Sequence, residues 1–540
     1  MKFLSIASLL VLSIINGINA HTYESLGINA VKKQETEALI SKEHTIPIIN
    51  VSTKDNSELI LSRDNYTDCV VDFFNVENKF KFSEKSAKIR VRGNYSGFYG
   101  DAEQIKNNTV PYKIKFDEKT SFYGLHNGEK FKSWTLLKTF DGVILNDIGL
   151  RIGRQIFGNE QYISDSKFVN LYVNDKFQGL YVLCEQNEVN EKRVNISKPE
   201  KNYNGTDIGY YFELDQYYYE KQGQFFRYLY EGATVTDLRG KERTFFKAEY
   251  TLKSDFYCQE QLDFIGHFTT SIFKIIYLAV EKGEFQTFDE NYNLVNSTYT
   301  NAQDTISAVM DINTVVNMYL LYEIVHDNDV GEGSFYFAAD FADKSKTPKL
   351  QMVSPWDFDW ILTDGPRRYW AAAFVEDSFI QEYRDRSNPW FVLLGKEEWF
   401  HELVAKKWEA VSDLVKAQVP EQKAYIDENI DEFLKIANVI PEAMQNIENE
   451  HEWLLNRFEW MDEAFVPGRG IYPIPSEEIP AAETTTTEIE IPTTVYSTVT
   501  ETSTIYIDDD DDDIAQEVEA TVAVNEDDDS DSEYSDEEEQ

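Results

Sequence analysis

The chain contains only three cysteines, Cys69, Cys184 and Cys258, in 540 residues. At most one disulfide can form within it, so a chain of this length depends on an ordinary hydrophobic core. Cys184 ends an apolar segment, residues 179–184, which predicts a buried core position. Cysteine chemistry is therefore not expected to be the function.

Basic residues are also scarce, since 51 Lys and Arg stand against 96 Asp and Glu, a net charge of −45. Residues 471–540 contain 24 acidic residues and no Lys or Arg, which leaves 72 acidic and 51 basic residues, a net charge of −21, before residue 471. An acidic chain repels the phosphate backbone of nucleic acids. We therefore expect no nucleic-acid partner.

The apolar run at the N-terminus, residues 3–15, is too short to span a bilayer comfortably. It follows Lys2 and gives way to small and polar residues up to Ala20, which is typical of a secretory signal peptide. We expect residues 1–20 to be cleaved, no transmembrane helix to remain, and the protein to be secreted, extracellular or at the cell surface. An uncleaved anchor is the alternative.

Glycosylation sequons of the form Asn-x-Ser/Thr agree with a secretory route, although the motif is frequent by chance. They occur at Asn50, Asn65, Asn107, Asn195, Asn204 and Asn296, with a further one at Asn94.

Residues 471–540 have the composition of a disordered tail, because a Thr/Ser-rich stretch and a run of six aspartates, residues 508–513, cannot build a core. No apolar stretch ends the chain, so we expect no lipid-anchor signal. The predicted organisation is a signal peptide over 1–20, one folded domain over 21–470 and the tail over 471–540.

Strand patterns dominate the first half of the domain and helical patterns the second, which predicts an α+β fold with two lobes. A helix is also predicted over 141–157, between strands. The predicted strands are 87–92, 111–116, 133–138, 168–173, 180–183 and 209–214, and the later helices are 259–283, 312–325, 395–417, 421–437 and 440–465.

Residues 323–365 hold the most informative pattern, because two β-type runs flank a short polar connection and predict an antiparallel hairpin. Asp329 and Asp357 are both fourteen positions from residue 343, so a hairpin centred there brings their carboxylates together. Residues 355–360, Pro-Trp-Asp-Phe-Asp-Trp, would as a strand place both acids on one face. Such acids are costly to bury unless they bind a metal or form ion pairs, and both alternatives stay open.

A set of cations lies upstream on two predicted strands. Arg90 and Arg92 alternate on one strand, and Lys113 and Lys115 alternate on the next. Four cations on one sheet face suit a polyphosphate, but a solvated face gives the same pattern. Asp327 and Asp329 have a comparable structural alternative as helix-end or turn residues.

Several familiar catalytic patterns are missing. His401 and His451 lack the second histidine of a zinc-protease helix, and the chain has neither a P-loop nor a Gly-x-Ser-x-Gly elbow.

Six ordered segments resemble the CotH family of spore-coat-protein-H-like kinases, over roughly residues 45–450. This family of atypical protein kinases includes secreted and cell-surface members in fungi, and our chain resembles that secreted type. The segments are 90–96 (Arg-Val-Arg-Gly-Asn-Tyr-Ser), 111–116, 134–138, 171–185, 211–215 and 355–359.

The resemblance implies a divergent, two-lobed kinase-like fold that binds ATP with Mg²⁺ or Mn²⁺. It implies that Asp357 is the metal-binding acid, with Asp359 as a second ligand or its support, and that Asp329 is the acid of the catalytic loop. For the phosphates it implies the cations Arg92 and Lys113 or Lys115, and it implies that Glu185 fixes one of these cations or lies near the nucleotide.

The chain departs from the family at one position. Many members have an asparagine after the catalytic-loop acid as a metal ligand, whereas here residues 330–334 read Val-Gly-Glu-Gly-Ser. Glu332 or Ser334 is the candidate substitute, and without one the protein would be a weak or inactive kinase.

The expected function is transfer of phosphate from ATP to Ser or Thr of secretory or cell-surface proteins. The chain's own tail offers acceptors in Ser530, Ser532 and Ser535. The alternative function is a kinase-like surface protein that acts as an adhesin or binding module. A third idea is that the aspartate run alone binds Ca²⁺ or basic partners.

Overall fold

The structure is a computed structural model, which describes residues 20–93, 110–139, 142–215, 223–228, 234–236, 238, 242–244, 248–331, 333–342, 348–362, 388–437 and 440–473. The predicted signal peptide up to residue 19 and the predicted tail beyond Pro473 lie outside the described residues, as do Asn94, Asn107 and Glu332.

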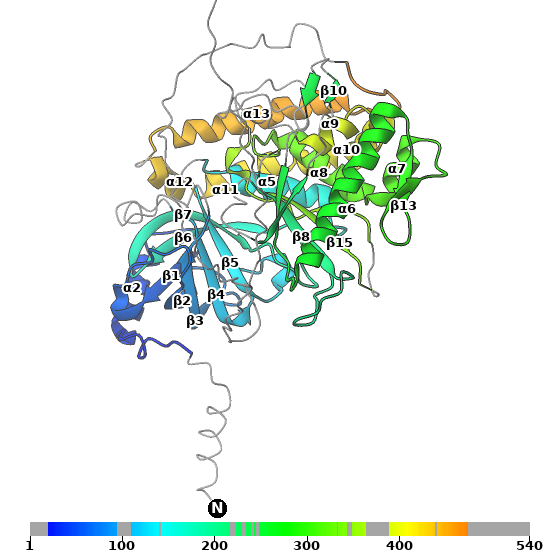
Figure 1. Ribbon diagram of the computed structural model, residues 1–540. Coiled ribbons are helices and arrows are strands. Elements are labelled where there is room, and N and C mark those ends of the chain that lie inside the picture. Colours follow the sequence, from blue (N-terminus) through cyan, green and yellow to red (C-terminus); the bar gives the residue numbers. More distant parts are fainter. Residues whose placement is uncertain are drawn as a thin grey trace, which may run out of the picture. The chain divides into compact units, whose positions relative to one another are not determined.

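A closed barrel of strands forms the N-terminal part of the fold (Figure 1). Its neighbours are antiparallel except β1 and β6, whose parallel pairing closes the ring. Because side chains alternate along a strand, every second residue faces inward, and Ile89, Ile114 and Trp134 fill the interior. In the order β1-β2-β3-β4-β5-β7-β6, the strands are Ile48–Thr53, Thr67–Phe74, Phe82–Val91, Tyr112–Thr120, Phe131–Lys138, Lys176–Glu185 and Ser166–Val173.

A second, antiparallel sheet follows in the chain, with the strand order β16-β15-β8-β12-β9. Its strands are Gln351–Val353, Phe335–Asp340, Gly209–Leu214, Ala248–Leu252 and Phe225–Tyr228 in that order. Two small hairpins accompany it, β10 (Thr234–Thr236) with β11 (Glu242–Thr244), and β13 (Gln286–Phe288) with β14 (Leu294–Asn296).

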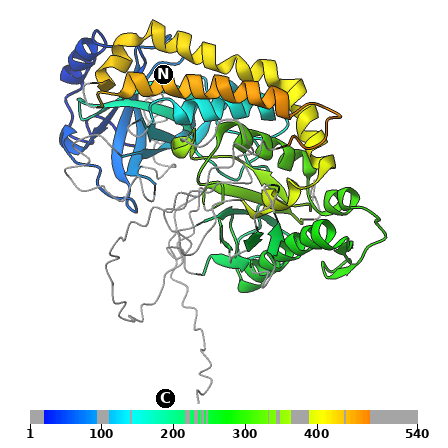
Figure 2. The same cartoon turned by 90° about the horizontal axis from the view of Figure 1, so that it is seen from above.

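Most of the helices are in the C-terminal half. Figures 1 and 2 show α13 running along one side of this domain, near α10 and α11, which it contacts. The helices are α2 Ala30–Ile40, α5 Leu145–Phe157, α6 Gln259–Tyr277, α7 Ala302–Val309, α8 Ile312–Val325, α9 Pro389–Leu394, α10 Glu398–Lys416, α11 Gln418–Glu428, α12 Ile430–Ala437 and α13 Ala443–Ala464.

The predicted mixed α+β class is confirmed, with strands dominating the first half and helices the second. All six predicted strands exist, and α8 has the predicted bounds. The predicted helix 421–437 is wrong in one respect, because α11 and α12 are separate helices that meet at Asn429. Three helices, α2, α7 and α9, were not predicted from the sequence.

One helical stretch, α6 with its π-helical continuation Leu278–Lys282, is long and apolar enough to cross a membrane. In that stretch, 67% of the most apolar window is buried inside the domain, and Phe273 packs edge-on against Trp390. These contacts are those of a core helix.

The predicted glycosylation sequons differ in how exposed their asparagines are. Asn50 lies in the middle of β1 and is fully buried, and its amide donates to Asp175. A glycan cannot be accommodated there in the folded chain, so this sequon is not a glycosylation site of the folded protein. Four other sequon asparagines are exposed: Asn65, Asn195, Asn204 and Asn296.

A buried ion pair joins α13 to α8. The Arg457 guanidinium lies 2.5 Å from Glu323 Oε1 and also donates to the Glu323 carbonyl oxygen, and both side chains are almost fully buried. Arg457 also stacks over Trp460. Two buried charges are stabilised only when they are paired and hydrogen bonded, as they are here.

We expect Arg457→Met to lower the free energy of unfolding by about 3–5 kcal/mol, because it leaves the Glu323 carboxylate buried without its cation. Urea unfolding followed by circular dichroism measures the loss. The double variant with Glu323→Gln should recover part of it, whereas equal instability of single and double variants would contradict the ion-pair explanation.

A second polar contact ties the N-terminal segment to α12. The Glu432 carboxylate accepts hydrogen bonds from the Thr45 N–H and from Lys435, and it lies 2.8 Å from His44 Nδ1. Burial opposes ionisation of Glu432, but the hydrogen bonds from His44, Lys435 and Thr45 outweigh it and lower its pKa to about 2.

Glu432→Gln should therefore lower the free energy of unfolding by roughly 2 kcal/mol at pH 7. Because the pKa of the folded state is the lower one, this contribution exists above the ordinary Glu pKa and disappears as pH falls from about 5 towards 2. Urea unfolding at pH 7 and pH 3 tests it, with the exposed Glu428→Gln as the control. A difference that persists at low pH would contradict the assignment.

Candidate active site

The predicted hairpin is present, since β15 pairs with β16 in antiparallel fashion. Its register differs from the prediction: Tyr336 lies opposite Val353, whereas a hairpin centred on residue 343 would place it opposite Leu350. Only three residues of β16 pair, and the strands end before either predicted acid. Asp329 and Asp357 are therefore positioned by loops, not by the ladder.

The segment after β16 is not the strand that its alternating pattern predicts. Asp357 has φ 69° and ψ 61°, a left-handed conformation that is costly for a residue with a side chain, and a 3₁₀ turn follows at Phe358–Trp360. Trp356 and Phe358 are nevertheless buried, while Asp357 and Asp359 are partly exposed. The alternating pattern therefore predicted correctly which of these residues are buried. Its prediction of a strand was wrong.

Phe358 anchors this turn on α5. Its N–H donates to Asn146 Oδ1 at 3.1 Å, and its ring lies against Gly149, where an added Cβ would be 2.5 Å from the ring carbon Cγ. Only glycine allows this close approach, so α5 fixes the backbone on which Asp357 and Asp359 stand.

Backbone hydrogen bonds join the loop after α8 to the segment after Asp359. The Asn328 N–H donates to the Trp360 carbonyl oxygen at 3.3 Å, and the Leu362 N–H donates to that of Val325 at 2.9 Å. On the other side, the Asn388 side chain donates to the Val330 carbonyl oxygen at 2.9 Å. These contacts hold the two acid-bearing segments side by side.

Four carboxylates gather at this junction. Burial and the charge of Asp329 raise the pKa of Asp327 well above its usual range, with further contributions from Asp357 and Asp359. Asp327 is 4% exposed, and it accepts a hydrogen bond from the Asp329 N–H at 2.8 Å. Asp327 therefore stabilises a turn, which is the structural alternative that its sequence position suggested. It is also part of an acidic cluster.

Ser334 is the described candidate for the position where many relatives have asparagine. Its Oγ donates to Asp357 Oδ2 at 3.1 Å, and its own φ is 52°. Two left-handed residues therefore face each other at the base of the hairpin. Of the two predicted substitutes, Ser334 contacts Asp357, and Glu332 lies outside the described residues.

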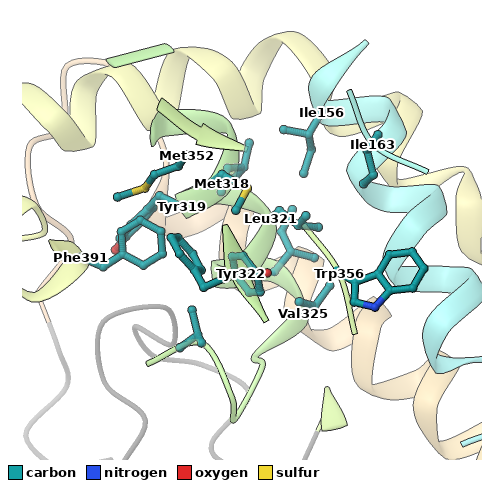
Figure 3. Packing of buried hydrophobic residues seen from close by; sticks show 14 of the residues in the cluster. Ile156, Ile163, Met318, Tyr319, Leu321, Tyr322, Val325, Met352, Trp356 and Phe391 are labelled. Carbon is teal, nitrogen blue, oxygen red and sulfur yellow. The ribbon is translucent and has the colours of Figure 1, made fainter. Parts of the chain in front are cut away.

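Arg92 reaches this junction from the barrel. Its guanidinium lies 5.1 Å from the ring centroid of Trp356, the residue before Asp357. Trp356 is 3% exposed and belongs to the core cluster that also contains Val325, as Figure 3 shows. A cation over an indole face is favourable, so Trp356 positions Arg92 next to the acidic segment.

Lys113 lies on the neighbouring strand and faces the same outer side of the barrel, since Arg90 is its cross-strand partner. It is only 9% exposed. In the described part of the chain it forms no hydrogen bond or ion pair. A buried ammonium is expensive without an anionic partner, which suits a residue that binds an anionic ligand.

The remaining predicted cations have other surroundings. Arg90 donates to the Arg63 carbonyl oxygen and lies over Tyr66. Lys115 is partly exposed and lies opposite Lys88 and Ser133.

Glu185 has described partners other than the predicted cations, and its predicted place near the nucleotide stays a prediction. It is fully buried, accepts a hydrogen bond from the Asp165 N–H at 2.6 Å, and lies 2.9 Å from His126 Nδ1. Its cross-strand partner is Trp134, which fills the barrel, so alternation turns Glu185 away from the face of Lys113. Its ion-pair partner is a histidine, not one of the predicted cations.

The acids suit a cation that needs few protein ligands. No group of three or more His, Cys, Asp or Glu side chains could hold a metal within the described ranges. Mg²⁺ commonly takes only one or two carboxylates and completes its shell with waters and phosphate oxygens. Asp357, with Asp359 nearby and Ser334 on one oxygen, fits that smaller requirement.

Sequence reasoning missed a buried polar network behind the hairpin. Lys253 lies 2.6 Å from Glu213 and 3.0 Å from Asp215, and Glu213 is hydrogen bonded to Tyr336 of β15. Burial and the Glu213 carboxylate raise the pKa of Tyr336, and Asp357 contributes. The alternation of Glu213 and Asp215 on one strand was the available signal.

The family model for the CotH kinase protein matches residues 89–461. The match covers more than half of the chain and includes Arg92, Lys113, Asp329 and Asp357, so the chain belongs to the CotH kinase family. No curated protein matches the chain.

Arg92 and Arg90 offer a matched test of the phosphate-binding prediction, because they lie two residues apart on the same outer face. Arg92→Ala should weaken ATP binding about 10–100-fold, since a charged hydrogen bond to phosphate is lost. Arg90→Ala should change the affinity little. Calorimetric titration with ATP and Mg²⁺ measures both, and equal losses in the two variants would refute a specific role for Arg92.

Proposed function

We propose that this protein is a secreted atypical protein kinase that transfers phosphate from ATP to Ser or Thr of secretory or cell-surface proteins. Membership of the CotH kinase family supports kinase chemistry in general. ATP, the metal, the acceptor and the cellular location are parts of the proposal.

The contact of Arg92 with Trp356 carries the proposal. It places a barrel cation beside the acidic segment, yet its described partner is an aromatic ring and not a carboxylate. A cation beside an acidic segment suits a ligand that bridges the two, and a metal-bound polyphosphate has that character.

The residues divide into three roles. Arg92 and Lys113, with Lys115 as a further candidate, hold the phosphates. Mg²⁺ or Mn²⁺ bound at Asp357 and Asp359 would neutralise charge on the γ-phosphoryl group. Asp329 orients the acceptor hydroxyl and accepts its proton.

The proposed organisation keeps a cleaved signal peptide over 1–20, a two-lobed kinase-like domain over 21–470 and a disordered tail over 471–540. The exposure of Asn65, Asn195, Asn204 and Asn296 supports passage through a glycosylating compartment.

The second candidate function is a kinase-like binding module or adhesin with weak or no transfer. The altered loop after Asp329 favours it, because the described candidate substitute for the asparagine, Ser334, donates its hydroxyl to Asp357 and is a poorer metal ligand than an amide oxygen.

Phosphate transfer by the full chain, with Mg²⁺ or Mn²⁺ and radiolabelled ATP, decides between the two functions. We expect Asp329→Asn to lower transfer by about 10²–10⁴-fold, the usual contribution of a general base. Asp357→Asn should abolish metal-dependent ATP binding as well. Asp413→Asn, an exposed acid on α10, is the control.

Transfer that is equal in all variants would reject the assigned residues. ATP binding without transfer, or neither with either metal, would support the binding module. Mass spectrometry of Ser530, Ser532 and Ser535 after incubation tests the tail as an acceptor.

A further inference from the structure

A polar layer lies between α2 and the barrel, away from the residues assigned to catalysis. Helix α2 packs on the outer face of β1 and β2 through Ile40, which contacts Ile48 and Phe74. Next to this apolar contact, the same face carries Asn50 and Ser52 from β1 and Asp72 from β2, and all three are almost fully buried.

Several oxygens in this layer have no hydrogen-bond donor. They are buried acceptor atoms of three side chains from three different elements: Glu37 Oε1 of α2, Asn50 Oδ1 of β1 and Asp72 Oδ2 of β2. Ser52 Oγ and Asn56 Oδ1, which are close in the sequence to Asn50, are also buried without a hydrogen-bond partner. Buried polar atoms are nearly always paired, so such a concentration points to an occupant.

The three side chains are neighbours. Asn50 lies directly opposite Asp72 in the β1–β2 ladder, so their side chains stand next to each other on one face. Glu37 approaches Asp72 closely enough for the two carboxyl groups to interact as hydrogen-bonding partners.

The other polar atoms of Asp72 and Asn50 already have hydrogen-bond partners, which fixes the orientation of these two side chains. Asp72 Oδ1 accepts from the Tyr23 hydroxyl at 2.5 Å, from Ser83 Oγ at 2.9 Å and from the Glu84 N–H at 2.7 Å. The Asn50 amide nitrogen donates to Asp175 Oδ1 at 2.8 Å. That bond turns the Asn50 Oδ1 away from Asp175.

The carboxylates of this layer outnumber its described cation. Lys33, which is 2% exposed, lies 2.6 Å from Asp175 and pairs with it. Glu37 and Asp72 remain as two neighbouring carboxyl groups, and burial and the charge of Asp72 disfavour ionisation of Glu37. A divalent cation would stabilise both carboxylates in their ionised form.

We propose that Glu37, Asn50 and Asp72 bind a Ca²⁺ ion beneath α2. All the donors are oxygens, which excludes the metals that prefer sulfur or nitrogen. Ca²⁺ accepts an irregular shell of carboxylate, amide and hydroxyl oxygens, whereas Mg²⁺ demands near-ideal octahedral geometry. Only two donors are carboxylates, so the site differs from a cluster of three acidic or histidine ligands.

The ion would fasten α2 to β1 and β2. This inference does not depend on the proposed kinase function, because none of its residues belongs to the predicted active site.

Equilibrium dialysis and thermal unfolding of the metal-free full chain, with CaCl₂ or MgCl₂ added, test the site. We expect Ca²⁺ to raise the melting temperature by about 2–4 °C and Mg²⁺ to have a smaller effect. Glu37→Gln should remove most of the Ca²⁺-induced rise in melting temperature. The variant protein should also bind one Ca²⁺ fewer per chain. Glu35→Gln, an exposed acid on the same helix, should keep both.

Further variants separate other Ca²⁺ binders in the chain. The aspartate-rich tail is unchanged in both α2 variants, so its contribution cancels in the comparison. Asp357→Ala should leave the response intact, which distinguishes this site from the proposed catalytic metal. Asp72→Asn should repeat the loss, which keeps the test valid should Glu37→Gln fold poorly.

Two results would overturn the proposal. The first is a Ca²⁺ response equal in Glu37→Gln and Glu35→Gln, which would locate the ion elsewhere. The second is no response at all, which would assign the oxygens to buried waters or to a proton shared by Glu37 and Asp72. Burial and the charge of Asp72 do raise the pKa of Glu37, to about 8.

Discussion

The buried ion pair between Arg457 and Glu323 is the contact on which the candidate active site depends. Glu323 stands near the end of α8, three residues before the left-handed His326 that starts the acid-bearing loop. Because α8 is apolar on all sides, packing alone leaves its rotation weakly specified. The buried charge pair to α13 specifies it, together with the hydrogen bonds of Thr314 and Asn317, and the positions of Asp327 and Asp329 follow.

Opposite charges in the site are carried by different parts of the fold. The barrel supplies Arg92 and Lys113, while loops at the hairpin supply the acids, and Trp356 connects the two. Ser334 and Asp357 are joined by a side-chain hydrogen bond, and both have a strained, left-handed backbone conformation. Strain of this kind persists only where surrounding packing enforces it, and α5 provides that packing through Gly149.

Local patterns predicted most of what is local. Strand alternation identified the faces of β3 and β4, and α8 was placed correctly, because periodicity reports burial directly. It did not reveal the register of β15 with β16, the turn at Asp357, or the histidine partner of Glu185. Each of these depends on contacts between segments far apart in the chain. Residue patterns singled out the acids and cations of the site, the family resemblance assigned their roles, and those roles stay predictions.

Closure of the barrel has a consequence for how much of the chain forms a foldable unit. The family match begins at residue 89, but β1, β2 and most of β3 precede it. A fragment cut to the matched residues would lose the strand that joins β6 to β2, and would expose two unpaired sheet edges together with the apolar interior around Leu171. We expect such a truncation to aggregate, so the stable domain begins before the first residue of the family match.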